Sequence, residues 1–487
     1  MKPEHPDDPR RVASLIRSSG LELVRLSWCD THGMLRGKTL SAEAAIRALD
    51  SGVSMVSTLL LKDTSDRTVY RVFEAETAAE LHGLGHAGNV QLMPDPNSFR
   101  ILPWADRTGW LQCQPLLADG QVAGFDTRWQ LQRALARLAE RGLGLRCGLE
   151  VEFHIYKLLP GDRPADRDPR LAAWPGPAPE VELIHPGYNL LSEALFDQAE
   201  APLRIVQRTA EALGLPLLSL EIELGPSQVE AVFDVTDALQ AADNMVIFRS
   251  AVRQALRREG YHATFMCRPP FAHIMSSGWH LHQSLDQLAT GANSFARPAP
   301  LEGSGPLQAG HWLSEIGCAY LAGLLSHARG MTLLCTPTVN GLGRFRPHAL
   351  APQHILWGHD NRGAMLRVIG GPGDRATRIE NRLGEPAANP YLYMASQIYA
   401  GLSGIDARRV PPQATTNPYG EHQPDGHTLP TRPADALQAL LDDPVLRAGF
   451  SQGFLDYYGR IRASEQARHA AAEDTLEFER REYFNRI

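Results

Sequence analysis

Apolar and polar positions alternate along several short segments of the first hundred residues. Each segment has the two-residue period of a half-buried strand, and the segments are LELVRLSW, VSMVSTLLL and GNVQLMPD. Residues 9–19 and 41–50 have helical composition instead and flank the first of these strands. The pattern ends near Pro103-Trp104. We therefore predict a small mixed α/β domain over residues 1–103.

The remaining residues, 104–487, contain longer helical segments between strands. Residues 126–142 are typical of a helix, with Asp126 as its N-cap and Gly142 as its C-terminal stop. A strand follows in LRCGLEVEFHIY, and two further helices, each followed by strand-like sequence, lead to SGWHLHQSL. This order predicts an α+β fold in which the strands carry the chemistry.

Ionisable residues occur in pairs two positions apart on these strands, so both members of a pair share one face. The pairs are Glu150 with Glu152, Glu221 with Glu223 and His280 with His282, and Glu230 follows the second pair across a turn. Burying so many carboxylates is costly unless cations neutralise them. Carboxylates with one imidazole favour Mg²⁺ or Mn²⁺ over Zn²⁺. A single pair is usually the solvated face of a sheet, but the coincidence of three makes a metal site an equal alternative.

Arginines are concentrated between residues 344 and 382. They are Arg344, Arg346, Arg362, Arg367, Arg375, Arg378 and Arg382. The planar guanidinium group suits phosphate and carboxylate oxygens, and arginine beside acidic metal ligands is typical of nucleotide-phosphate chemistry. A salt-bridge network on the surface is the alternative. Neither GxxxxGKS/T nor GxGxxG occurs within this arginine-rich segment, so we predict no phosphate loop of those kinds there.

Composition narrows the class of protein. The formal net charge of −7 argues against nucleic acid as the main partner, because phosphate-binding proteins usually have a basic excess. No run of about 18 apolar residues occurs, so we expect no membrane span. The first residues lack the apolar segment of a signal peptide, which favours the cytoplasm. The six cysteines are scattered without a CxxC pair, which is typical of reduced, mostly buried thiols.

Seven segments together resemble the glutamine synthetase superfamily, in the order and at roughly the spacings of that family. They are GLEVEF, EIELGPSQVE, ATFMCRPP, SGWHLHQSL, NGLGRFRPHALAP, DNRGAMLRV and RIENRLGEPAANPYL, within a similarity that covers about residues 20–480. The resemblance implies an N-terminal β-grasp domain (1–103) and a catalytic domain (104–487) whose antiparallel strands form a funnel surrounded by helices. It implies that ATP enters at one end and the acid at the other, with two or three Mg²⁺ or Mn²⁺ ions. It also implies a ring of subunits, commonly a double hexamer, in which a neighbour's N-terminal domain completes each site.

The resemblance also implies roles by motif position. Glu152, Glu223 and Glu230 are similar to the ligands of one metal ion, and Glu150, His280 and Glu380 to those of a second. His282, Arg362, Arg375 and Arg378 match positions near the ATP phosphates. Arg344, Arg367 and Arg382 match positions that hold the substrate carboxylates and the phosphorylated intermediate. Among the arginines, we expect Arg344, Arg362 and Arg367 to be catalytic.

Three departures from glutamine synthetases bear on the amine. Leu350 stands where the family has a flap glutamate that shields the site and deprotonates ammonium, so we expect Leu350 to contact the substrate by apolar packing. The segment SGVSMVSTLLLKDTSD lacks the DGSS motif of the ammonium site, and MSSG (275–278) replaces NGSG. The ammonium site thus lacks two carboxylates, the flap glutamate and the aspartate of the DGSS motif, and this loss predicts an organic aryl or alkyl amine as the substrate. We expect this amine to be joined to glutamate through a γ-glutamyl phosphate. The chain then resembles the superfamily's γ-glutamyl ligases for polyamines, alkylamines and anilines.

Three alternatives stay open. The chain could be a glutamine synthetase that uses ammonium, or a γ-glutamylpolyamine synthetase. A structural or regulatory member of the superfamily would be expected to lose metal ligands, whereas all six matched positions are occupied here.

Overall fold

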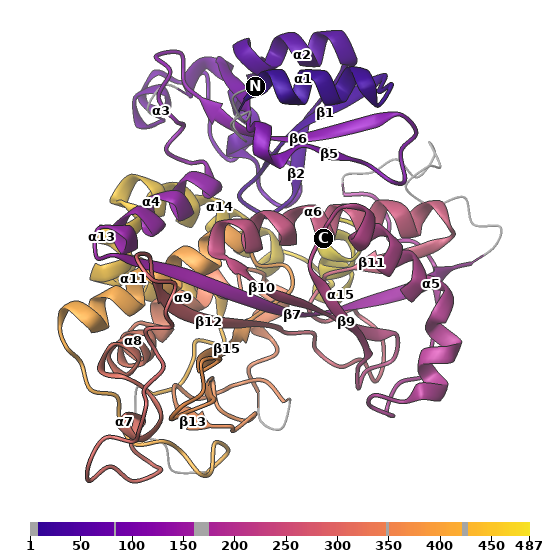
Figure 1. The fold of residues 1–487 in the computed structure, drawn as a ribbon. Coiled ribbons are helices and arrows are strands. Elements are labelled where there is room, and N and C mark those ends of the chain that lie inside the picture. Colours follow the sequence, from indigo (N-terminus) through magenta and orange to yellow (C-terminus); the bar gives the residue numbers. More distant parts are fainter. Residues whose placement is uncertain (1–7, 82–83, 160–174, 347–349, 421–426) are drawn as a thin grey trace.

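The alternating segments of the first hundred residues contribute strands to a six-stranded mixed sheet (Figure 1), although Ser57–Leu61, the second half of VSMVSTLLL, forms a 3-10 helix instead. The structure is a computed structural model that describes residues 8–81, 84–159, 175–346, 350–420 and 427–487. The strands pair in the order β2-β1-β6-β4-β3, and β5 pairs with β6. Their bounds are β1 (Leu23–Cys29), β2 (Leu35–Ser41), β3 (Val53–Val56), β4 (Asn89–Pro94), β5 (Arg100–Ile101) and β6 (Thr108–Leu116). The helices of this part are α1 (Pro9–Ser18), α2 (Ala42–Ser51) and α3 (Ala75–Glu80).

Strand β6 lies in the middle of this sheet. It pairs in parallel with β1, with Leu23 opposite Thr108, and antiparallel with β4 and β5. The sheet therefore extends to Leu116, beyond residue 103, where the sequence analysis ends the first domain. Pro103-Trp104 resembles a linker in sequence, but it lies in the turn that joins β5 to β6. The predicted boundary thus falls between β5 and β6, which are paired strands of one sheet.

The rest of the chain is built around a curved nine-stranded sheet (Figure 1). The order is β13-β14-β15-β12-β7-β10-β9, with β8 and β11 paired to β7. All neighbours are antiparallel except β13 and β14, which confirms the predicted antiparallel α+β domain. The bounds are β7 (Leu143–Leu158), β8 (Val181–Leu183), β9 (Leu217–Ile222), β10 (Gln228–Asp237), β11 (Tyr261–Thr264), β12 (Trp279–Gln287), β13 (Trp357–His359), β14 (Leu366–Ile369) and β15 (Arg378–Gly384).

Strand β7 is the long central strand of this sheet, and its two faces have different surroundings. Val151 and Phe153 are fully buried, and Phe153 packs against Phe248 of helix α6, with ring centroids 5.9 Å apart. Because side chains alternate along a strand, Glu150 and Glu152 lie on the opposite face. The apolar residues of β7 therefore hold the sheet against the helices, while its glutamates face the site.

Helices cover the sheet and fill the core around it (Figure 1). The predicted helix after Asp126 is confirmed as α4, because Asp126 accepts a hydrogen bond from the backbone of Trp129 (3.0 Å). Helix α11 is almost wholly buried between α4 and α8. The bounds are α4 (Thr127–Ala139), α5 (Glu193–Ala212), α6 (Ala238–Arg258), α7 (Ala309–Trp312), α8 (Glu315–Ser326), α9 (Ala328–Cys335), α10 (Val339–Leu342), α11 (Pro390–Asp406), α12 (Pro433–Asp442), α13 (Pro444–Phe450), α14 (Gln452–Ala470) and α15 (Thr475–Glu479).

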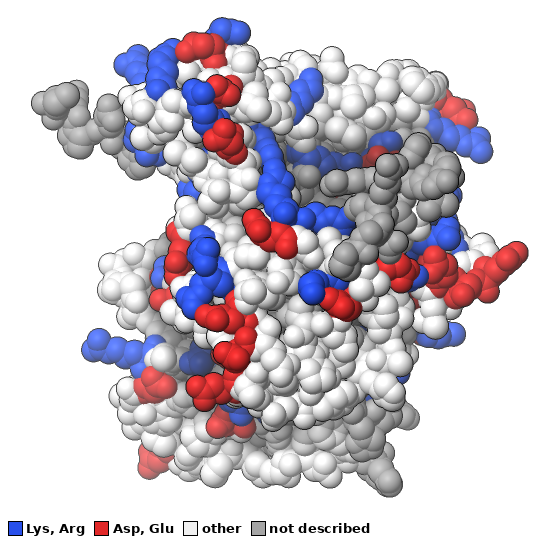
Figure 2. Space-filling view, turned by 90° about the vertical axis from the view of Figure 1, so that its right-hand side faces the viewer, with Lys and Arg blue, Asp and Glu red and all other residues white. Residues whose placement is uncertain are grey.

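The surface and the thiols agree with the composition. Lys and Arg are interspersed with Asp and Glu over the face drawn in Figure 2. Among the described helices, none has the length and apolar character needed to cross a bilayer. The six cysteines are free, and five of them are buried, as the sequence predicts.

Candidate active site

Strand register brings the predicted ligands together, although they are up to 230 residues apart in the sequence. On β7, β10, β12 and β15 the residues that stand opposite one another are Glu152 and Glu230, Glu150 and His280, and His282 and Glu380. Glu223 follows the end of β9, which pairs with β10. Four neighbouring strands therefore present carboxylates and imidazoles to one face of the sheet.

Three glutamates form what we call the acidic cluster: Glu152, Glu223 and Glu230. Each offers an oxygen, and these oxygens lie within 4.8 Å of one another. Burial, reinforced by Glu223, raises the pKa of Glu152 to about 8, and burial with repulsion from Glu152 raises the pKa of Glu230 to about 10. Burial also raises the pKa of Glu223. A divalent cation would remove this penalty, and an all-oxygen set suits Mg²⁺ or Mn²⁺, so the residues fit the predicted metal site.

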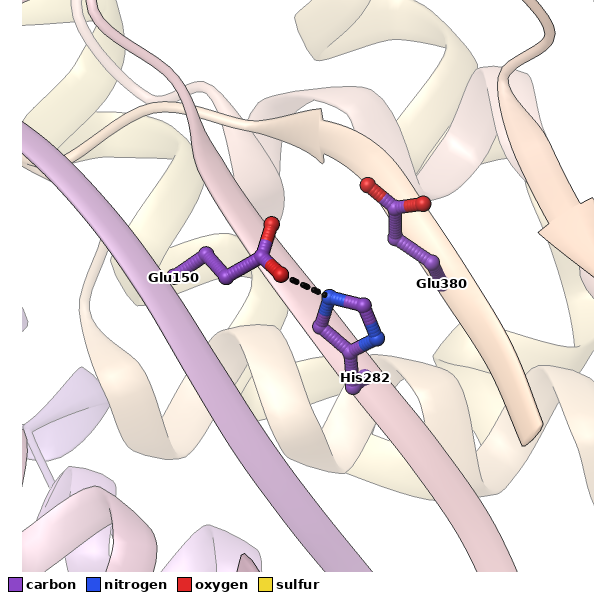
Figure 3. A group of neighbouring side chains, drawn as sticks. All are labelled: Glu150, His282 and Glu380. Carbon is purple, nitrogen blue, oxygen red and sulfur yellow. Dashed lines mark ion pairs between the residues drawn. The ribbon is translucent and has the colours of Figure 1, made fainter. Parts of the chain in front are cut away.

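The neighbouring group, which we call the mixed cluster, consists of Glu150, His280, His282 and Glu380. Glu150 reaches His282 Nε2 with one oxygen (2.9 Å) and His280 Nδ1 with the other (3.3 Å). Burial alone would raise the pKa of Glu150, but the hydrogen bonds with the two histidines hold it well below its ordinary value. Burial lowers the pKa of His280 to about 4. Figure 3 shows Glu150 and Glu380 reaching from strands on either side of His282.

Two arginines neutralise Glu380, which is fully buried. Arg367 Nη1 donates to it at 3.1 Å, and Arg382 Nη1 bonds its other oxygen. Burial would raise the pKa of Glu380, but His280 and Arg382 outweigh that effect and lower it. Protein cations therefore outweigh burial at Glu380, whereas in the acidic cluster Arg344 and Arg382 act on Glu152 but burial still raises its pKa.

The structure adds one residue to the predicted ligands. All six predicted ligands fall within three groups of possible metal-binding atoms, and His282 joins Glu150 and Glu380 in one of them. The sequence analysis placed His282 beside the nucleotide phosphates and His280 with Glu150 and Glu380. His280 Nδ1 lies 3.7 Å from Glu380, so either imidazole can face a cation between these carboxylates. The two-residue spacing of the histidines already indicated that both share this face.

Two cavities meet at the mixed cluster, and both are lined by Glu150 and Val232. The first has a volume of about 630 Å³ and is lined by Arg375, Arg378 and His282. Arg378 Nε donates to His282 Nδ1 (3.0 Å). This arrangement brings together three of the four residues that the sequence analysis assigned to ATP.

The second cavity, about 770 Å³, contains the acidic cluster. Its basic lining consists of Arg344, Arg362, Arg367 and Arg382, and Leu350 stands on its wall. Arg362 therefore lines the second cavity rather than the first. Of the arginines noted in the sequence, Arg346 lines neither cavity.

The segment with the departing N-terminal sequence does not line either cavity within the described chain. Its Asp63 is buried and accepts a hydrogen bond from Arg468 Nε of α14 (3.1 Å). MSSG does reach the second cavity: the backbone N–H of Gly278 donates to Glu152 (2.8 Å), and a Cβ at Gly278 would lie 2.9 Å from Arg344. Within the flap motif, residues 347–349 lie outside the described residues.

Sequence reasoning missed residues on both sides of the acidic cluster. Gln228 is buried, and its Nε2 donates to Glu152 Oε2 (2.9 Å). Its position two residues before Glu230 on β10 could have revealed it, because both side chains share a face. Leu190 and Leu191 also line the second cavity, and no pattern in their segment indicated it.

Comparisons with known proteins agree with this geometry. Residues 124–481 match the family model of the glutamine synthetase catalytic domain. A γ-glutamylanilide synthase of Acinetobacter sp is 40% identical, over 98% of this chain and 96% of the relative. A glutamate–isopropylamine ligase of Pseudomonas sp is 28% identical, over 96% of each chain. A glutamine synthetase of Halobacterium salinarum is 29% identical, over 97% of this chain and 96% of the relative.

Solved structures show the same similarity. A GmaS/ADP complex superposes with a TM-score of 0.75 at 28% identity, over 95% of this chain and 97% of that chain. The family match spans the sheet that carries both clusters, and this chain belongs to the glutamine synthetase family.

Proposed function

We propose that this chain is an ATP-dependent ligase that joins the γ-carboxylate of glutamate to an aryl amine. The observation that carries the proposal is the acidic cluster, three glutamates whose pKa values are raised by burial, inside a cavity with four arginines and apolar walls. The 40% identical relative is named a γ-glutamylanilide synthase, which supports the choice of amine.

The chemistry follows from the poor reactivity of a carboxylate, from which an amine cannot expel oxide. A carboxylate oxygen attacks the γ-phosphorus of ATP, ADP leaves, and a γ-glutamyl phosphate forms. The amine nitrogen then attacks the carbonyl carbon, phosphate leaves, and the nitrogen loses a proton. Mg²⁺ or Mn²⁺ would supply charge neutralisation for the transferred phosphoryl group.

We assign the residues of the two cavities to the two ends of this reaction. Arg375, Arg378 and His282 hold the nucleotide, because they line the cavity that ends at Glu150. Arg344, Arg362 and Arg367 stabilise the phosphoryl group and the glutamate carboxylates in the other cavity, and Arg382 supports them through Glu380. The acidic cluster would hold one cation, and Glu150, Glu380 and a histidine would hold the second.

The choice of an aryl amine rests on charge. Ammonium and polyamines are cations at neutral pH and gain from carboxylates that accept their protons, whereas Leu350 offers only apolar contact. An aryl amine is largely neutral at pH 7, so its nitrogen needs no base before it attacks. The relative named glutamate–isopropylamine ligase supports an alkyl amine as the second candidate.

A panel of amines tests the proposal. ADP release is measured with glutamate and aniline, isopropylamine, putrescine or ammonium, and the amide is identified by mass spectrometry. We expect the highest kcat/KM with aniline and at least about 100-fold slower ADP release with Glu230→Gln. Fastest turnover with ammonium or putrescine would replace the proposal with a glutamine synthetase or a γ-glutamylpolyamine synthetase. Absence of turnover with every amine, at any Mg²⁺ or Mn²⁺ concentration, would favour a structural or regulatory protein.

We also propose that the chain assembles into a double hexameric ring. Support comes from family membership and from the second cavity, which the chain's own N-terminal segment does not cover in the described residues. Light scattering during size-exclusion chromatography measures the mass, and a fully active monomer would contradict this proposal.

A further inference from the structure

Two exposed leucines on the wall of the second cavity have an unusual backbone conformation. Leu191 has φ 55° with 62% of its surface exposed, and Leu350 has φ 57° with 59% exposed. Leucine is unfavourable in the left-handed region and is normally buried. Leu191 and Leu350 are the leucines with a positive φ in the described part of the chain, and both line the same cavity as the acidic cluster.

The backbone around Leu191 is held by defined hydrogen bonds. The N–H groups of Tyr188 and Leu191 donate to the carbonyls of Leu224 (2.7 Å) and Ile222 (3.0 Å). The Tyr188 hydroxyl donates to the carbonyl of His273 (2.6 Å). A strained residue persists only when its surroundings determine its conformation, and such residues concentrate at ligand sites. The exposed position of Leu191 is therefore built into the fold.

These anchors also fix where Leu191 stands relative to the chemistry. Ile222 and Leu224 are the neighbours of Glu223, a member of the acidic cluster. Leu190 and Met275 add further apolar surface to the lining of this cavity. Apolar walls thus stand beside the carboxylates of the same cavity, a combination that suits a ligand with one apolar part and one polar nitrogen.

We propose that Leu191 and Leu350 determine specificity by holding the aromatic ring of the amine between them. The inference rests on the proposed function and deepens it, because it names the walls of the acceptor subsite. Apolar contact with a ring removes both leucines from water, whereas a small cation such as ammonium leaves them hydrated and loses its own hydration. The two leucines therefore favour an aryl amine over ammonium.

The test is the ratio of kcat/KM for aniline to kcat/KM for ammonium in Leu191→Asn. Asparagine adopts the left-handed region readily, so this change removes the apolar side chain and keeps the loop conformation. We expect the ratio to fall at least about tenfold, with KM for glutamate and ATP near that of the parent. The melting temperature should stay equal or rise, because backbone strain is relieved. Leu183→Asn, on β8 and 51% exposed outside both cavities, is the matched control and should keep the ratio.

The outcomes separate this inference from the proposed function. A parent enzyme that forms no γ-glutamylanilide but forms another amide would contradict the proposed function and remove the basis of the inference. An active parent whose ratio is unchanged in Leu191→Asn would overturn the inference alone. A fall confined to isopropylamine would also overturn it, because the occupant would then be an alkyl group. If Leu191→Asn does not fold, Leu350→Asn makes the same change at the other positive-φ leucine.

Discussion

The acidic cluster and the mixed cluster lie on neighbouring strands of one sheet, yet they treat negative charge in opposite ways. In the acidic cluster, burial and mutual repulsion raise the pKa of Glu152, Glu223 and Glu230. In the mixed cluster, histidines and arginines lower the pKa of Glu150 and Glu380. The number of carboxylates in a group therefore does not by itself indicate whether the group needs a metal ion; the charges around the carboxylates matter as well. The protein stabilises one group itself and leaves the other to be stabilised by a ligand.

The sharpest way to break this comparison is to neutralise one glutamate in each cluster. Glu230→Gln removes a carboxyl that folding forces to keep its proton at neutral pH, so without metal the free energy of unfolding should rise by about 1 kcal/mol. It also removes a ligand, so ligase activity should fall at least about 100-fold. In the parent, metal at about 100 times its Kd should add about 2.7 kcal/mol, and the variant should lose most of this gain. Thermal melting in EDTA and in Mg²⁺ or Mn²⁺ measures these effects.

Glu380→Gln is the matched change in the mixed cluster. It leaves Arg367 and Arg382 without their shared carboxylate, and breaking a buried ion pair in this way costs about 3 kcal/mol. The metal-free melting temperature should therefore fall, opposite in sign to Glu230→Gln. Melting shifts in the same direction for both variants would show that the two clusters do not differ as described.

A smaller effect is expected from the residue that orients the acidic cluster. Gln228→Leu removes the hydrogen bond to Glu152 and nearly conserves the side-chain volume. Such a change beside a metal ligand weakens metal affinity by about 10- to 100-fold. Calorimetric titration with Mn²⁺ measures this loss. Gln207→Leu on α5, which lines neither cavity, is the control and should bind Mn²⁺ like the parent.

Adding a carboxylate to the cavity of the acidic cluster should change which amines the site prefers. Leu350→Glu introduces an anion where the chain presents apolar surface, so cationic amines gain and the aryl ring loses contact. We expect the ratio of kcat/KM for aniline to that for ammonium to fall about tenfold. Leu350→Met keeps the apolar character and should keep the ratio. An unchanged ratio with Leu350→Glu would mean that Leu350 does not contact the amine.

Buried histidines outside the two clusters make the stability of the chain depend on pH, so the clusters should be compared at one fixed pH. Burial lowers the pKa of His262 to about 3 and that of His32 to about 4, away from the acidic cluster. The unfolded chain protonates these histidines below about pH 6.5, while the folded chain does not, so stability falls as pH drops from 6.5 towards 4. Each histidine should contribute up to about 1.4 kcal/mol per pH unit. Urea unfolding of the parent and of His262→Gln checks this slope, which should be shallower in the variant.

The sequence predicts the shared faces of the site but not its pairings. A two-residue period places Glu150 and Glu152 on one face of a strand, and this part was readable because the period is local. Glu152 opposite Glu230 depends on the register of β7 and β10, which only the packed sheet determines. The charge balance of Glu380 depends in part on Arg367, a neighbour on β14, and cannot be read from either residue alone.

Backbone conformation and sheet membership were also beyond the sequence. Leu191 has a positive φ in a segment held by two hydrogen bonds, from its own N–H to Ile222 and from the N–H of Tyr188 to Leu224, and both acceptors lie some thirty residues away. Position 191 is neither glycine nor asparagine, the residues that usually indicate a positive φ. Strand β6 was assigned to the second domain, because its partners β1 and β4 are separated from it by a turn that resembles a linker.

Strand β7 fixes the positions of two site glutamates, whereas the proposed amine contacts lie outside it. Glu150 and Glu152 are two residues apart on it, so a rigid repeat of about 7 Å sets the offset between the mixed cluster and the acidic cluster. The amine contacts proposed above come instead from loops at the edge of the cavity, near Leu191 and Leu350. Substitutions in those loops can retune the acceptor amine without moving a phosphate-binding group. Relatives named for anilide, isopropylamine and glutamine synthesis are what such an architecture would produce.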